Sequence, residues 1–81
     1  MINWEKRITQ VYEWTNTLDD EFMENHEEAV TIIRRILVEL ESTLLDDSKE
    51  AEDKRLSLFA SLRAIAKAEF PSSWPHRRGL D

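Results

Sequence analysis

The stretch EEAVTIIRRILVELESTLL, residues 27–45, carries the strongest structural signal in the sequence. Its apolar residues recur at alternating steps of three and four, at Val30, Ile33, Leu37, Leu40 and Leu44. This spacing places them on one face of an α-helix. Further apolar side chains flank this face, so much of the helix circumference is apolar, as in helices at the centre of an assembly. We therefore predict a central helix over residues 26–45.

The residues before this stretch continue the helical period. One stripe is formed by Trp4, Ile8, Val11, Thr15, Leu18 and Phe22. With Asn3 as the N-cap, the stripe predicts one helix over residues 3–24. A break near Thr17 is the alternative, because Thr17 and Asp20 have the spacing of a capping box. The uninterrupted stripe favours a single helix.

A third helix is predicted over residues 48–69. Its broad apolar face includes Leu58, Phe59, Leu62, Ile65, Ala66 and Phe70. Asp47 and Glu50 have the spacing of a cap and its N3 partner at the start of this helix. Pro71 ends it, because the residue before a proline is pushed out of the helical region.

The connections between the predicted helices are short. The first lies near Asn25, which forms another cap-and-N3 pair with Glu28. Short connections favour antiparallel neighbours. The predicted fold is therefore all-α, a small antiparallel three-helix bundle formed by residues 1–70, with an extended tail formed by residues 71–81 that packs on the bundle or on a partner.

Composition limits how such a bundle can be stabilised. The chain has 81 residues, is 41% hydrophobic and contains no cysteine, so disulfides cannot support a small core. Tight helix packing or self-association must do so. The apolar runs are too short to span a membrane. The first residues lack an apolar signal region, and we expect a protein of the cytoplasm.

The sequence offers no recognisable site for catalysis or for a cofactor. His26 lies among carboxylates, but the Glu-x-x-His pattern of bundle metal sites is missing, because Met23 stands where the glutamate would be. A single glycine cannot build a phosphate-binding loop, and no serine or threonine has the context of a nucleophile. We predict that the protein is not an enzyme and binds no metal or cofactor. A site for a small molecule is disfavoured in so short a chain, and no segment resembles a known family.

Charge is unevenly distributed along the chain. The net charge is −6, with fifteen acidic and five basic side chains in residues 1–53 and two acidic and six basic in residues 54–81. One interpretation of this asymmetry is that basic side chains of the third helix form ion pairs with the acidic helices. The other is that the acidic residues recognise a basic partner. The sequence pI of about 4.9 disfavours direct nucleic-acid binding. The densest acidic run spans residues 19–28 and contains Asp19, Asp20, Glu21, Glu24, Glu27 and Glu28.

Aromatic side chains provide the second group of candidate contacts. Trp4 lies on the stripe and is expected in the core. Tyr12 and Trp14 lie at its margins, where half-exposed rings either form the rim of the core or contact a partner as binding hot spots. Arg7 lies close to the same face and is expected to cover the core with its aliphatic stem. In the tail, Trp74 stands between two prolines. It either folds back as a lid near the end of the third helix or anchors a partner.

These features predict a small acidic helical interaction module. It would bind and occlude a basic surface of a partner protein, as an inhibitor, antitoxin, immunity protein or adaptor does. The alternative is a structural or assembly subunit, a homodimer or larger species that self-associates through the second predicted helix. The candidate partner-binding residues are Tyr12, Trp14, Asp19, Asp20, Glu21, Glu24, Glu27, Glu28, Trp74, Arg77 and Arg78.

Overall fold

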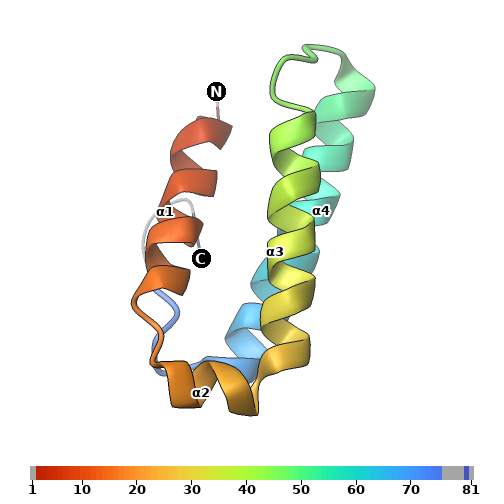
Figure 1. Ribbon diagram of the computed structural model, residues 1–81. Coiled ribbons are helices and arrows are strands. Elements are labelled where there is room, and N and C mark those ends of the chain that lie inside the picture. Colours follow the sequence, from red (N-terminus) through yellow and green to blue (C-terminus); the bar gives the residue numbers. More distant parts are fainter. Residues whose placement is uncertain (1, 76–79, 81) are drawn as a thin grey trace.

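The computed structural model describes residues 2–75 and residue 80 and folds them into helices without strands. The helices are α1 (Trp4–Asn16), α2 (Asp20–Asn25), α3 (Glu27–Ser42) and α4 (Lys49–Glu69). The predicted all-α class is confirmed. Figure 1 shows α1 running down to α2 at the base of the molecule, α3 returning upward and α4 running down beside it, so the three long helices alternate in direction. The molecule measures 40 × 23 × 18 Å.

The helix predicted over residues 3–24 is interrupted, which corrects the uninterrupted reading of the stripe. Thr17 terminates α1, and its hydroxyl donates to the carbonyl oxygen of Trp14 at 2.7 Å. Asp19 then caps α2, and its Oδ1 accepts from the backbone N–H of Glu21 at 3.0 Å. Short polar side chains offer the backbone alternative hydrogen bonds at such positions. The break therefore lies near Thr17, but Asp19 rather than Thr17 is the cap.

The other two helix starts also differ from the predicted caps by one residue. The residue before α3 is His26 rather than Asn25, and the His26 side chain turns to Glu69, with Nδ1 and Oε2 3.1 Å apart. Ser48 rather than Asp47 caps α4, because its extended backbone lets Oγ accept from the backbone N–H of Ala51 at 3.2 Å. The predicted short connections and their positions hold within a few residues.

The core lies between α1 and the α3–α4 pair. Its fully enclosed side chains come from all three long helices and from the segment after α4, and include Val11, Leu37, Leu40, Leu62, Ala66 and Leu80. Near the top of the bundle, the rings of Trp4 and Phe59 meet edge to face with centroids 5.8 Å apart. Trp4 is a core residue, as predicted.

A buried arginine holds the α3–α4 connection in place. Arg55 donates from Nη1 to the carbonyl oxygens of Thr43 and Asp46, the latter at 3.0 Å. It also donates from Nη2 to Oε2 of Glu52 at 3.1 Å. The guanidinium thus binds two carbonyls of the connection that follows α3, and Glu52 balances its charge. The charge pattern predicts Arg55 only as one of several basic residues facing the acidic helices.

Within the part of the chain that the structure describes, none of the helices combines the length and apolarity needed to cross a membrane.

Candidate protein-binding site

A cluster of aromatic rings closes the lower end of the bundle. Trp14 of α1 meets Phe70 edge to face, with ring centroids 5.4 Å apart, and meets Trp74 in the same way at 4.9 Å. Only 5% of Trp14 and 2% of Trp74 is exposed. The indole Nε1 of Trp14 donates to Oγ of Ser73 at 3.3 Å. These contacts tie the segment after α4 to α1.

The turn after α4 explains how Trp74 reaches this position. Phe70 makes the last helical hydrogen bond, to the carbonyl oxygen of Ala66 at 2.8 Å, and Pro71 prevents the helix from continuing. The backbone N–H groups of Ser73 and Trp74 both donate to the carbonyl oxygen of Phe70, at 3.2 and 3.0 Å. The chain therefore reverses and places Trp74 beneath Trp14, which is the geometry expected of a lid.

This arrangement corrects the half-exposed margin expected for Trp14. The helical period places Trp14 at the edge of the α1 stripe, but the turn after α4 covers that edge. In this conformation neither Trp14 nor Trp74 presents its ring to a partner. Arg77 and Arg78, predicted as partner contacts beside Trp74, lie outside the described residues.

The acidic run forms the base of the molecule. All six of its carboxylate side chains are exposed, and they are divided between α2 and the start of α3: Asp19, Asp20, Glu21, Glu24, Glu27 and Glu28. The junction at His26 means that they do not follow one continuous helix axis. Acidic side chains in the first turn of a helix are favoured by the helix dipole. We call this group the acidic base.

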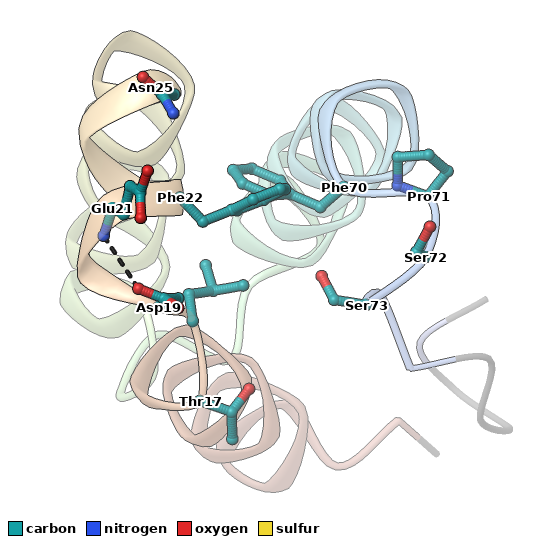
Figure 2. Close-up of a pocket in the computed structure, with 10 residues that line it drawn as sticks. Thr17, Asp19, Glu21, Phe22, Asn25, Phe70, Pro71, Ser72 and Ser73 are labelled. Carbon is teal, nitrogen blue, oxygen red and sulfur yellow. Dashed lines mark hydrogen bonds between the residues drawn. The ribbon is translucent and has the colours of Figure 1, made fainter.

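A cleft opens at one side of the acidic base, between α2 and the end of α4 (Figure 2). Its volume is about 490 Å³. Apolar groups come from Leu18, Phe22, Phe70 and Pro71, and polar groups from Thr17, Asp19, Glu21, Asn25, Ser72 and Ser73. Figure 2 shows Phe22 pointing from α2 toward Phe70. The two rings have centroids 5.4 Å apart, and 39% of Phe22 stays exposed.

His26 supports the cleft from behind. Its ring lies 4.6 Å from that of Phe22 and 5.2 Å from that of Phe70, centroid to centroid. Its pairing with Glu69 joins the start of α3 to the end of α4. His26 is thus a partly buried junction residue rather than a solvated one. No group of three metal-ligating side chains occurs among the residues that the structure describes.

Tyr12 lies away from this cleft, half-buried against α3. Burial raises the pKa of Tyr12, and the neighbouring Glu41 carboxylate raises it further through its charge and a hydrogen bond, while Arg34 acts in the opposite direction. The Tyr12 side chain packs against the core cluster. It belongs to the rim between α1 and α3 and does not join the acidic base.

Arg7 covers the opposite part of the core. Its guanidinium carbon lies 5.2 Å from the ring centroid of Trp4 and 5.3 Å from that of Phe59. Burial and then the charge of Arg63 lower the pKa of Arg7, and Glu52 partly offsets this. The guanidinium of Arg7 therefore lies close to both aromatic rings, within the distance of a cation–π contact.

The structure brings together residues that the sequence pattern does not connect. The predicted acidic residues Asp19 and Glu21 line the same cleft as Phe22, Phe70 and Pro71, which were assigned to the apolar stripe, the third helix and the helix stop. Two sequence features point to this contact: Phe22 continues the apolar stripe of the first predicted helix, and Pro71 ends the third. These features do not reveal that the segment after α4 returns to the α1–α2 junction.

Comparison with known proteins finds no matching family model, no matching curated protein and no matching solved structure. The function is therefore argued from the residues of the site.

Proposed function

We propose that the protein binds a basic surface of a partner protein through its acidic base and thereby occludes that surface. The observation that carries the proposal is the placement of six exposed carboxylates beside a cleft that contains a partly exposed phenylalanine. Interfaces commonly combine such an apolar contact with polar and charged groups around it. The inhibitor, antitoxin, immunity and adaptor types all belong to this class, and the cytoplasmic location predicted from the sequence is part of the proposal.

The charge of the protein affects both the rate and the specificity of association. A net charge of −6 attracts a basic partner before contact, and six of the seventeen acidic side chains lie in the acidic base. Complementary charges raise the association rate and exclude acidic partners more than they raise affinity. Contact by Phe22 then removes apolar surface from water at the cleft. Attraction at long range and apolar contact at short range are thus supplied by neighbouring groups.

The rigidity of the base favours recognition by a preformed surface. α2 is anchored by the Asp19 cap at its start and by the pairing of His26 with Glu69 after its end. The aromatic rings beneath it are enclosed by the bundle. A partner would therefore meet side chains whose backbone is already ordered, which limits the entropy lost on binding.

A charge-reversal experiment tests the proposal. The tagged protein is used to capture partners from its native host, beside the variant Asp20→Lys/Glu24→Lys/Glu27→Lys and the matched control Glu13→Lys/Glu39→Lys/Asp53→Lys. Both variants change the net charge equally, and all six positions are exposed. We expect the wild type and the control to retain a basic protein, the acidic-base variant to lose it, and added salt to weaken retention. Equal retention by both variants would contradict the proposal.

Self-association through α3 is the second candidate, and the exposed apolar side chains of that helix favour it. Val38 is 59% exposed and Ile32 37% exposed, and both line a depression on α3 beside Arg34 and Arg35. A symmetric pair of α3 helices would cover these side chains. Light scattering on the purified protein, with Val38→Asp as the variant, tests this reading. A monomer at all concentrations would contradict it.

A further inference from the structure

We propose that the cleft of the acidic base receives one arginine side chain of the partner protein. This inference rests on the proposed function and specifies what the basic surface presents at its centre. The cleft lies where the end of α1, the short helix α2 and the turn after α4 meet, so three separate segments shape it. A site of this construction is more selective than a field of surface carboxylates.

The apolar side of the cleft suits the stem and the flat face of a guanidinium side chain. Phe22 is partly exposed, whereas Phe70 behind it is fully enclosed. Figure 2 shows Phe22 directed toward Phe70, with Pro71 at the end of α4 on the far side. Long basic side chains lay their methylene groups along such surfaces and keep the charged end in water. A guanidinium also stacks on an aromatic face, which an ammonium does less well.

The charged side of the cleft suits the guanidinium end. Asp19 and Glu21 both line the cleft and are both exposed. The hydrogen bond from the Glu21 backbone to Oδ1 of Asp19, drawn in Figure 2, holds one carboxylate at the rim in a fixed position. Arginine offers a planar fork of donors to carboxylates, and charge-assisted bonds of this kind are the strong ones. A lysine would supply a point charge without that fork.

The cleft has room for one long side chain, because its volume is about 490 Å³. A partner helix would need a long groove with anchors on successive turns. This cleft is instead lined by the six-residue helix α2 and by residues of two connecting segments. The surrounding carboxylates repel an acidic peptide and attract a basic one.

A titration followed by nuclear magnetic resonance tests the inference directly. The ¹⁵N-labelled protein is titrated with acetyl-Gly-Arg-Gly-amide and, separately, with the citrulline analogue, which has a similar shape and no charge. We expect saturable shifts at the amides of residues 17–22, 70, 72 and 73, and binding at least about tenfold weaker for citrulline because the charge-assisted contacts are lost. Equal binding of both peptides, or shifts spread evenly over the acidic base, would overturn the inference.

Matched double variants separate the cleft from the general negative field. Asp19→Asn/Glu21→Gln removes two charges that line the cleft, and asparagine preserves the cap of α2. Asp20→Asn/Glu24→Gln removes two charges from the same helix outside the cleft. We expect the first variant to weaken arginine peptide binding by about tenfold and the second to change it by less than about twofold. An equal loss of affinity in the two variants would show that the peptide is attracted only by the general negative charge of the surface, and would overturn the inference.

Phe22→Leu tests the ring itself. Leucine keeps an apolar side chain against Phe70, so the fold is retained, while the aromatic face is lost. We expect weaker arginine binding with an unchanged circular dichroism spectrum. Unchanged binding would contradict a role for the ring and hence the proposed arginine site in the cleft.

The same variants distinguish failure of this inference from failure of the proposed function. The triple reversal Asp20→Lys/Glu24→Lys/Glu27→Lys can abolish capture of a partner that Asp19→Asn/Glu21→Gln and Phe22→Leu still retain. In that case the acidic base is the interface, and the inferred arginine site in the cleft is wrong. If capture is unaffected by the triple reversal, the proposed function is wrong. The inference that the cleft receives an arginine side chain of the partner is then wrong as well. Loss of capture in the triple reversal and also in the cleft variants supports both the proposed function and the arginine site.

Discussion

The indole Nε1 of Trp4 donates a hydrogen bond to Oε2 of Glu52 at 2.9 Å, joining the start of α1 to the start of α4. The same carboxylate oxygen accepts from Nη2 of Arg55 at 3.1 Å. Arg55 in turn binds the carbonyl oxygens of the α3–α4 connection. A single carboxylate therefore links all three long helices at the end of the bundle opposite the cleft.

Replacing this carboxylate should loosen that end. We expect Glu52→Gln to lower the free energy of unfolding by about 1.5 kcal/mol, because the amide keeps an acceptor for Trp4 but loses the charge that faces Arg55. Urea unfolding followed by circular dichroism measures the change. Glu50→Gln, on the same turn but exposed, is the control and should leave stability nearly unchanged. Equal effects of the two substitutions would contradict the network.

Arg55 should be the most sensitive basic residue of α4. Arg55→Met keeps the length of the side chain but removes the donor that the Thr43 and Asp46 carbonyls share and leaves Glu52 without its cation, which should cost about 2–4 kcal/mol. Lys54→Met changes the charge equally at an exposed neighbour and should cost little. Thermal unfolding of the two variants compares them. A well-tolerated Arg55→Met would show that the connection does not depend on the guanidinium.

The Trp74 side chain should behave as part of the core. We expect Trp74→Ala to cost about 3–5 kcal/mol, as for other buried aromatic residues, and to lower the melting temperature by more than about 10 °C in a domain of this size. Trp74→Phe keeps a ring against Trp14 and should cost less. Truncation after Phe70 also removes the enclosed side chain of Leu80 and should therefore cost more than Trp74→Ala. Intact stability of the truncated chain with loss of partner binding would instead identify an anchor.

The single tyrosine permits a direct titration. The pKa of Tyr12 is raised above its ordinary value of 10.0, first by burial and then by Glu41. Because the raised pKa favours the neutral phenol in the folded state, its contribution to stability is complete below the unfolded pKa and is lost as pH rises through the folded pKa. Ultraviolet absorbance of the phenolate follows the titration. Glu41→Gln should lower the pKa of Tyr12, whereas Glu39→Gln should not.

The central helices were predictable because their apolar period is strong and local. The predicted helix over residues 26–45 corresponds to α3 and that over residues 48–69 to α4, with differences of a few residues at the ends. Leu37 and Leu62 lie in the core as their spacing requires. Such patterns depend only on which residues share a helix face, and that information is contained in the sequence.

The break between α1 and α2 was missed for a physical reason. The apolar positions remain in phase across Thr17, so the stripe itself gives no sign of an interruption. The hydrogen bonds of Thr17 and Asp19 decide the outcome, and each competes with the helical bonds at short range. The weaker capping signal therefore prevailed over the stronger apolar period.

The cleft and the burial of Trp14 depend on tertiary contacts that the pattern does not contain. Pro71 indicates where α4 ends but not the direction in which the chain turns. The return of Ser73 and Trp74 to α1 covers one aromatic ring and creates one wall of the cleft. The acidic residues could be identified as candidates from charge density alone, whereas their partner Phe22 could be chosen only with the structure.

The separation of the tryptophans gives each end of the bundle its own optical reporter. Trp4 and Trp14 are ten positions apart on α1, which corresponds to about 15 Å along the helix. Trp4 contacts the Glu52 network, and the enclosed pair of Trp14 and Trp74 contacts Phe70 and Ser73, which line the cleft. A ligand that binds at the acidic base should change the fluorescence emission of that pair and leave the emission of Trp4 unchanged. Tryptophan fluorescence can therefore locate a binding step without any attached dye.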